Sequence, residues 1–190
     1  VYEARKAVAD FFGLKEEDRM VFTSNSTESL NIAIFGLLNK EDHVVTTSME
    51  HNSVLRPIYL AHETIGCDYT IVHGDKTGMI SYEDLEEAIK PNTKILVITH
   101  SSNVTGNVID LKKIAAICKK HNIISVVDAS QTAGVIPINM EELDIDVLCF
   151  TGHKSLYGPQ GIGGLCIRLK EPEIRRYKVG GSGVRTFDKE

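Results

Sequence analysis

The sequence predicts an α/β fold, namely a three-layer, doubly wound domain with a mostly parallel sheet between two layers of helices. Helix-like and strand-like patterns alternate along most of the 190 residues. The expected strands are short apolar runs such as Lys94–Thr99 (KILVIT), and runs without polar alternation indicate strands buried on both faces. Strand–helix alternation implies parallel strands joined by right-handed crossovers. We expect one domain over residues 1–190, since this length suffices for a single core.

The first third of the chain predicts five elements. They are a helix within 4–12, a strand at 20–23, a helix from 26 to 38, a strand at 43–47 and a helix at about 53–65. Gly13 fits the position that follows a helix C-terminus. Leu30 and Ile34 share one face of the second helix, so we expect this face to pack on the sheet.

The remainder of the chain continues the same alternation. We expect a strand at 68–72, a helix at 81–89, a strand at 94–99, a helix at 110–121, and strands at 123–127, 147–150 and 164–167. Ser81 and Asp84 have the spacing of a helix-capping motif. Leu111, Ile114 and Cys118 place an apolar stripe on the helix at 110–121.

Composition excludes several functional classes. Hydrophobic residues make up 42% and charged residues 25% of the chain, which is typical of a globular protein. A net charge of -5 argues against nucleic-acid binding, which needs clustered positive charge. No apolar run approaches the ~20 residues that span a bilayer, so we expect no membrane association.

The four cysteines are widely spaced and form no C-x-x-C pair, which disfavours zinc and thioredoxin-like sites. Cys149 and Cys166 lie within apolar runs, where cysteine acts as a small buried hydrophobe. We therefore expect reduced thiols and a cytoplasmic location.

Polar side chains follow five of the expected strands. In a doubly wound sheet the ligand binds beyond the carboxyl ends of the strands. The polar segments at these ends are residues 24–28, 49–52, 101–106, 128–131 and 151–154. Their convergence on one edge indicates a binding site.

Each candidate residue also has an ordinary structural explanation. Ser26 and Thr27 can cap a helix, although a helix N-terminus with hydroxyls also binds phosphate. Asp128 and Lys154 can be solvated loop residues, and His51 can be a cap. The glycine-rich run at 158–164 nevertheless follows Lys154 closely, and glycines allow close backbone approach to a ligand. This run does not fit G-x-G-x-x-G and precedes a strand, so it does not support dinucleotide binding.

Four motifs carry a resemblance to a known family. They are T-G-H-K at 151–154, D-A-S-Q at 128–131, E-H-N-S at 50–53 and S-N-V-T-G at 102–106. Together they resemble the class V aminotransferase family, and within it the cysteine desulfurase and selenocysteine lyase-like proteins. The resemblance runs from about Arg5 to Gly183 with the motifs in the family's order. It implies the large domain of a fold type I enzyme that depends on pyridoxal 5′-phosphate.

The resemblance also implies roles for individual residues. Lys154 matches the lysine that forms the Schiff base, and Asp128 matches the carboxylate that keeps the pyridine nitrogen protonated, which makes the ring a better electron sink. His51 matches the imidazole that stacks on the ring and assists proton transfer. The other matches are Gln131 and Asn103 near the 3′-oxygen, and Ser26, Thr27, Thr151 and His153 around the phosphate.

The implied activity is conversion of L-cysteine to L-alanine with the sulfur left on the enzyme. The family works as a homodimer, and residues 180–183 resemble a glycine-rich segment that approaches the partner's cofactor. A sulfur-acceptor protein is a further expected partner. The family's persulfide cysteine and substrate-binding arginine lie in a small C-terminal domain. We expect that domain and an N-terminal segment to be absent here, which leaves a cofactor-binding core with low activity.

Three alternatives remain at this point. Another class V reaction, such as transamination or a different amino-acid lyase step, would use the same Lys154, Asp128 and His51. A non-catalytic α/β binding domain would not form a cofactor adduct. A metal hydrolase using His51, His153 and Asp128 is disfavoured because the chain has no H-x-x-x-H spacing.

Overall fold

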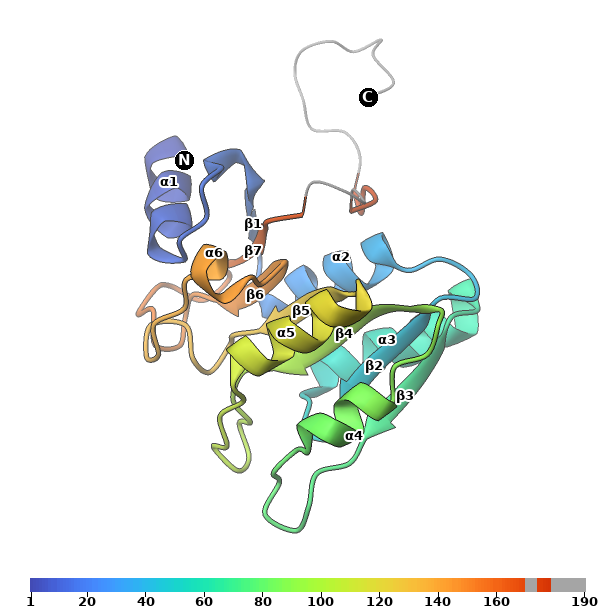
Figure 1. Cartoon of the computed structure of the whole chain (residues 1–190). Coiled ribbons are helices and arrows are strands. Elements are labelled where there is room, and N and C mark those ends of the chain that lie inside the picture. Colours follow the sequence, from blue (N-terminus) through green and yellow to red (C-terminus); the bar gives the residue numbers. More distant parts are fainter. Residues whose placement is uncertain (170–173, 179–190) are drawn as a thin grey trace, which may run out of the picture.

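A seven-stranded sheet forms the centre of the protein, with helices on both of its faces (Figure 1). The computed structural model describes residues 1–169 and 174–178. The strand order is β1-β7-β6-β5-β4-β2-β3. The strands are β1 (Met20–Thr23), β2 (His43–Thr47), β3 (Asp68–Val72), β4 (Thr93–Thr99), β5 (Ile124–Asp128), β6 (Val147–Thr151) and β7 (Gly163–Ile167). The predicted three-layer α/β architecture is confirmed.

Six of the seven strands run in the same direction. The strands β2 to β6 pair in parallel with their neighbours. The strand β7 pairs antiparallel with both β6 and β1, so β1 is parallel to β6. The carboxyl ends of β1, β2, β4, β5 and β6 therefore lie at one edge of the sheet.

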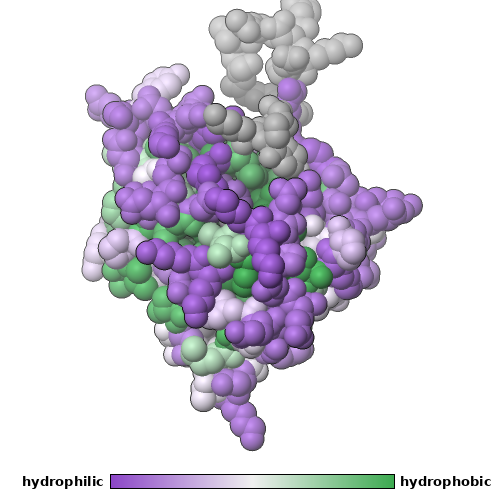
Figure 2. Space-filling model, in the orientation of Figure 1, coloured by the Kyte–Doolittle hydropathy of each residue, from purple (hydrophilic) through white to green (hydrophobic). Residues whose placement is uncertain are grey.

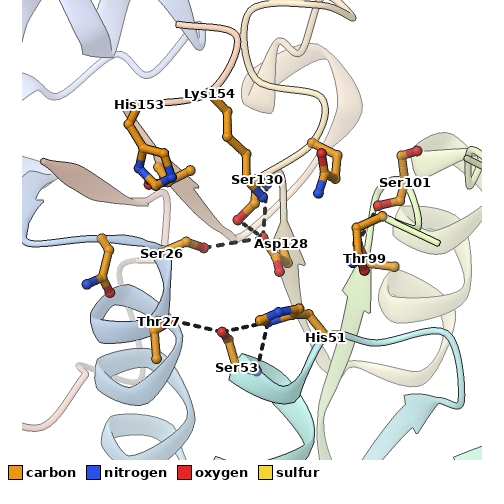
Figure 3. Close-up of a pocket in the computed structure, with 14 residues that line it drawn as sticks. Ser26, Thr27, His51, Ser53, Thr99, Ser101, Asp128, Ser130, His153 and Lys154 are labelled. Carbon is orange, nitrogen blue, oxygen red and sulfur yellow. Dashed lines mark hydrogen bonds between the residues drawn. The ribbon is translucent and has the colours of Figure 1, made fainter. Parts of the chain in front are cut away.

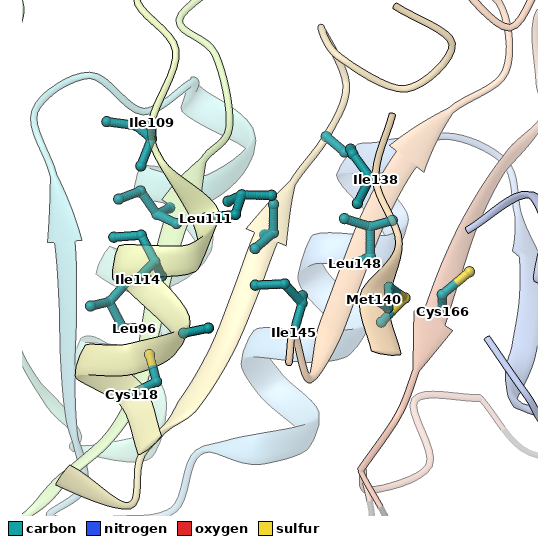
Figure 4. Close-up of a cluster of buried hydrophobic side chains, with 14 of the residues drawn as sticks. Leu96, Ile109, Leu111, Ile114, Cys118, Ile138, Met140, Ile145, Leu148 and Cys166 are labelled. Carbon is teal, nitrogen blue, oxygen red and sulfur yellow. The ribbon is translucent and has the colours of Figure 1, made fainter. Parts of the chain in front are cut away.

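The helices form the two outer layers. They are α1 (Tyr2–Phe11), α2 (Ser26–Leu37), α3 (Asn52–Ile65), α4 (Tyr82–Glu87), α5 (Leu111–His121) and α6 (Met140–Leu143), with a short 3-10 helix at Glu17–Arg19. Leu30 of α2 and Ile58 of α3 belong to the apolar cluster on one face of the sheet. Phe12 and Ile114 belong to the cluster on the other face, part of which is shown in Figure 4.

The strand β4 shows why its sequence lacks polar alternation. Ile95 and Val97 pack in the cluster under α2 and α3, whereas Leu96 and Ile98 pack in the cluster under α5. All four side chains are fully buried. A strand covered on both faces needs apolar residues at every position.

Several helix boundaries follow from side-chain caps. The Asn25 side chain accepts a hydrogen bond from the Glu28 amide at 2.9 Å and begins α2. Ser81 accepts one from the Asp84 amide at 3.1 Å and begins α4, as the capping motif predicted. The helix α4 ends at Glu87 instead of the predicted residue 89.

The helix α1 contacts the core through one side only. Its spacing of apolar residues predicted the helix, and Gly13 follows its end with a left-handed φ of 66°. However, Phe11 is 54% exposed, whereas Ala9 and Phe12 are buried. The helix lies at the margin of the domain (Figure 1), so only one side of it contacts the core.

The surface of the face seen in Figure 2 is mostly hydrophilic, with smaller apolar areas between the polar side chains. In the described residues, no helix has both the length and the apolar character that crossing a bilayer requires.

Candidate active site

A cavity of about 220 Å³ opens at the carboxyl edge of the sheet. Figure 3 shows side chains from separate strand ends pointing into it. Its lining residues are Asn25, Ser26, Thr27, His51, Ser53, Thr99, Ser101, Asn103, Asp128, Ser130, Gln131, Thr151, His153 and Lys154. All nine predicted site residues are among them. The strand-end rule therefore correctly brought these residues to one cavity, while their assignment as site residues and their individual roles stay predictions.

Asp128 is the most enclosed charged residue of this cavity. It is the last residue of β5 and is 4% exposed. Its Oδ1 accepts hydrogen bonds from the Ser130 amide at 2.9 Å, the Ser130 hydroxyl at 2.5 Å and the Ser26 hydroxyl at 3.3 Å. Such donors stabilise a buried carboxylate. Within the described part of the chain, no group donates to Oδ2.

His51 is both a cavity residue and the N-cap of α3. Its Nδ1 accepts hydrogen bonds from the Ser53 amide at 3.1 Å and from the Ser53 hydroxyl at 2.8 Å. Because Nδ1 acts as an acceptor, the proton of the neutral imidazole is on Nε2. The Thr27 hydroxyl lies 2.8 Å from the Ser53 hydroxyl and donates to it. The cap therefore fixes the tautomer and the orientation of the ring.

The N-terminus of α2 provides hydrogen-bond donors on one side of the cavity. The first amides of a helix have no intrahelical acceptor, and the helix dipole adds partial positive charge. Asn25, Ser26 and Thr27 begin α2 and all line the cavity. This arrangement suits an anionic group such as a phosphate.

Lys154 extends from the turn after β6 toward Ser130 and Asp128 (Figure 3). Thr151 is the last residue of β6 and is buried, and its hydroxyl lies 2.9 Å from Nδ1 of His153. His153 and Lys154 are exposed to the cavity opening. The Lys154 carbonyl accepts a hydrogen bond from the Tyr157 amide at 3.0 Å, which holds the base of this turn.

Two glycines permit the close packing of the lysine turn. Gly134 has a φ of 89°, and a Cβ there would lie 2.4 Å from the Ser155 carbonyl oxygen. The Gly158 amide donates to the Gly152 carbonyl at 2.8 Å, so the glycine-rich run folds back on the residues before Lys154. The run thus forms a tight turn beside Lys154, while its approach to a ligand stays a prediction.

Glu50 is a functional candidate that the sequence analysis did not select. It is 8% exposed, and its Oε1 accepts hydrogen bonds from the Thr47 hydroxyl at 2.7 Å and the Thr99 amide at 3.0 Å. Its Oε2 is buried and has no hydrogen-bond partner among residues 1–169 and 174–178. Burial raises the pKa of Glu50 to about 8, and the negative charge of Asp128 acts in the same direction. Glu50 is therefore mostly protonated at neutral pH.

Five lining residues were also not selected as site residues: Asn25, Ser53, Thr99, Ser101 and Ser130. Thr99 and Ser101 follow the same strand-end rule that selected Asn103. Ser130 stood within the D-A-S-Q motif, next to residues that were selected.

The four cysteines are buried and none lines the cavity, as expected for Cys149 and Cys166. Burial raises the pKa of Cys118 and of Cys166 to about 12, and it raises that of Cys149 well above the usual range. These thiols therefore stay protonated and unreactive near neutral pH.

The described residues contain no group of three or more histidine, cysteine, aspartate or glutamate side chains able to hold a metal ion. The site instead combines a carboxylate, an imidazole, an amine and a helix N-terminus.

The fold and this cavity define an α/β protein with a candidate small-ligand site at the carboxyl edge of its sheet. A family model described as aminotransferase class-V matches residues 1–190. The chain belongs to the class V aminotransferase family, as its motifs indicated.

Relatives and solved structures narrow the comparison. The chain is 37% identical over 186 residues to a cysteine desulfurase IscS from Dictyoglomus turgidum, with 96% of this chain and 46% of that protein covered. A structure of SspA in complex with cysteine matches with a TM-score of 0.87 and 34% identity over 96% of this chain and 53% of the other. A C-DES variant with glycine covalently linked to its PLP cofactor matches with a TM-score of 0.79 and 28% identity. The match covers 87% of this chain and 45% of the other. The chain thus spans about half the length of these proteins.

Proposed function

We propose that the cavity binds pyridoxal 5′-phosphate covalently through Lys154. The observation that carries this proposal is the convergence of Lys154, Asp128 and the N-terminus of α2 on one cavity. These groups fit the cofactor chemically: an amine for its aldehyde, a carboxylate for its ring nitrogen and helix amides for its phosphate. A similar solved protein carries this cofactor.

Each residue then has a defined task. Ser26 and Thr27 bind the phosphate with their amides at the helix start. Asp128 accepts the hydrogen bond of the ring nitrogen and keeps that nitrogen protonated. Bound in this way, the cofactor withdraws electrons from the substrate Cα.

His51 and Lys154 act on the reacting side of the site. His51 presents a neutral imidazole whose Nδ1 is occupied by the α3 cap, so it serves to stack and to donate from Nε2. Proton transfer at the substrate Cα falls to the Lys154 amine, which is exposed to the cavity opening.

We further propose that the whole protein is a cysteine desulfurase that converts L-cysteine to L-alanine and leaves the sulfur on an enzyme cysteine. The relatives named above and the cysteine complex of SspA support this substrate. Since the four cysteines are buried away from the cavity, we assign the sulfur-accepting cysteine to parts of the protein beyond these 190 residues. The resemblance to the family supports the same assignment for the carboxylate-binding arginine. The 190-residue chain alone then turns over little.

The wider setting follows from the same proposal. Enzyme-bound sulfur requires a thiol acceptor, so an acceptor protein is an expected partner, and we propose a homodimer in the cytoplasm. The segment that resembles a partner-contacting loop, residues 180–183, lies outside the described residues.

Borohydride reduction of the cofactor-loaded protein, followed by peptide mass mapping, tests the assignment of the lysine. We expect a pyridoxyl adduct at Lys154. Lys154→Ala should abolish the visible absorbance of the adduct without unfolding the protein, whereas Lys76→Ala, at an exposed lysine outside the cavity, should not. An adduct at another lysine refutes the assignment.

Product analysis of the complete protein tests the reaction. Alanine and sulfide released from L-cysteine in the presence of a reductant support the desulfurase proposal. Keto-acid production from L-alanine or L-cysteine identifies a transaminase, and preferential turnover of L-selenocysteine identifies a lyase of that substrate.

A further inference from the structure

The contacts around Asp128 suggest how its carboxylate is oriented. Resting on the proposed function, we propose that Ser26 and Ser130 are positioning residues that hold Asp128 with its Oδ2 directed at the cofactor's ring nitrogen.

The geometry separates the two oxygens of Asp128. Three donors converge on Oδ1: the Ser130 amide at 2.9 Å, the Ser130 hydroxyl at 2.5 Å and the Ser26 hydroxyl at 3.3 Å. No described group donates to Oδ2, and Asp128 lines the cavity. A half-turn of the carboxylate only exchanges two equivalent oxygens, whereas any smaller rotation would break the three bonds. One oxygen is therefore held by the serines, and the other is left for a different donor.

The two serines hold the carboxylate from different elements. Ser26 is the first residue of α2, whereas Ser130 follows the end of β5 by two residues. Figure 3 shows both hydroxyls beside Asp128, with Ser26 reaching it from α2 and Ser130 from the loop after β5. Constraint from two directions fixes the side chain more firmly than a local turn would.

This geometry refines the role of Ser26. The predicted role placed it in the phosphate cradle. Its hydroxyl points to Asp128 (Figure 3), while its backbone amide remains at the start of α2. One residue can thus connect both ends of the cofactor site, with its side chain at the ring end and its amide at the phosphate end.

Two ionisable neighbours of Asp128, Glu50 and Cys149, add no second negative charge beside it. Glu50 and Cys149 have pKa values raised mainly by burial and partly by the Asp128 charge. Both stay largely protonated near neutral pH. The hydroxyls of Ser26 and Ser130 therefore supply stabilisation of the carboxylate that these neighbours do not.

The test compares cofactor binding in Ser26→Ala, Ser130→Ala and the double variant of the complete protein. The ligands are pyridoxal 5′-phosphate and its 1-deaza analogue, in which carbon replaces the ring nitrogen. A hydrogen bond to a charged group contributes about a tenfold effect or more. We expect each single variant to bind the normal cofactor about tenfold more weakly, and the double variant more weakly still.

The deaza analogue separates the contribution of the ring nitrogen to cofactor affinity from that of the phosphate. Its affinity should be the same in the wild type and in the serine variants to within about twofold, because it makes no bond to Oδ2. With ring-labelled cofactor, the ¹⁵N resonance should move toward the unprotonated position in the double variant. Ser130→Thr, which keeps a hydroxyl, should retain the wild-type values.

Ser48→Ala is the matched control, since the Ser48 hydroxyl is exposed and contacts the Gly74 amide at 3.1 Å. It should bind both ligands as the wild type does. Equal losses of both ligands in the serine variants would show that the hydroxyls act on the phosphate or on the fold, and this outcome overturns the inference, as does no loss at all. If the wild type forms no adduct with either ligand, the proposed function itself is refuted.

Discussion

Glu50→Gln tests whether the buried carboxyl behind the cavity is neutral. The folded-state pKa of Glu50 is raised to about 8 from its usual value of 4.5. The folded protein therefore binds the proton more tightly, and stability is fully present below pH 4.5 and is lost as pH rises through about 8. At 1.36 kcal/mol per pKa unit, the separation of the two values corresponds to a loss of about 5 kcal/mol when the folded carboxyl ionises.

Glutamine keeps the acceptor that Glu50 uses. The Thr47 hydroxyl and the Thr99 amide both donate to Oε1, and an amide oxygen accepts from both. At pH 5.5, one pH unit above the usual pKa, the linkage should make the variant the more stable by only about 1.4 kcal/mol. The changed hydrogen bonds add a constant difference of about 1 kcal/mol or less at every pH. By pH 9 the variant should be the more stable by several kcal/mol, up to the value above.

Urea unfolding of the cofactor-free protein with a reductant at pH 5.5, 7 and 9 measures this difference. We subtract the unfolding free energy of the wild type from that of the variant at each pH, which cancels the titration of all other groups. Glu63→Gln, at an exposed carboxyl, is the matched control and should show a constant difference near zero. A difference between Glu50→Gln and the wild type that stays constant with pH would refute the reasoning.

Three further predictions concern the elements that frame the cavity. Gly134→Ala should destabilise the protein by about 1–3 kcal/mol, because its Cβ would lie 2.4 Å from the Ser155 carbonyl oxygen; an unchanged urea midpoint contradicts this. Asn25→Ala removes the acceptor of the Glu28 amide and should reduce the unfolding free energy by about 1 kcal/mol, measured in the same assay. Burial lowers the pKa of His100 from 6.5 to about 4, so its contribution to stability is present above pH 6.5 and is lost as pH falls toward 4; urea midpoints at pH 7, 5.5 and 4.5 should fall less steeply for His100→Asn than for the wild type.

The apolar runs allowed most of the fold to be predicted. Ile95 and Leu96 are neighbours in β4 but belong to the apolar clusters on opposite faces of the sheet. Only a strand covered on both faces requires an uninterrupted run of apolar residues. The site followed because parallel strands bring polar residues from distant positions to one edge. This logic depends on topology and needs no knowledge of side-chain packing.

The secondary-structure features that the sequence did not predict have local physical causes. The helix α4 ends at Glu87 because its last turn tightens: the Ile89 amide donates to the Glu86 carbonyl at 3.1 Å, a 3-10-type bond that leaves the α-helical pattern. The helix α6 is a single turn held by Asn139, and one turn produces no periodic pattern. The antiparallel direction of β7 was not visible in its apolar residues, since pairing direction depends on the connection.

The missed functional groups depend on tertiary packing. Glu50 stands in a polar segment, and nothing in its neighbours indicates that Thr47 and Thr99 enclose it. The Ser26 hydroxyl likewise could cap a helix or bind phosphate, and only its side-chain orientation directs it to Asp128.

The pairing of β1 with β7 has a consequence for synthesis. In the described part of the chain, β1 joins the sheet through β7, and the Ser29 hydroxyl donates to the Gly164 carbonyl across 135 positions of sequence. A ribosome adds about 5–20 residues each second, so β1 leaves the exit tunnel roughly 10 s before its partner. The strand β1 therefore joins the sheet late, whereas the helix that carries Ser26 and Thr27 can dock earlier, since α2 also packs on α3 and β6.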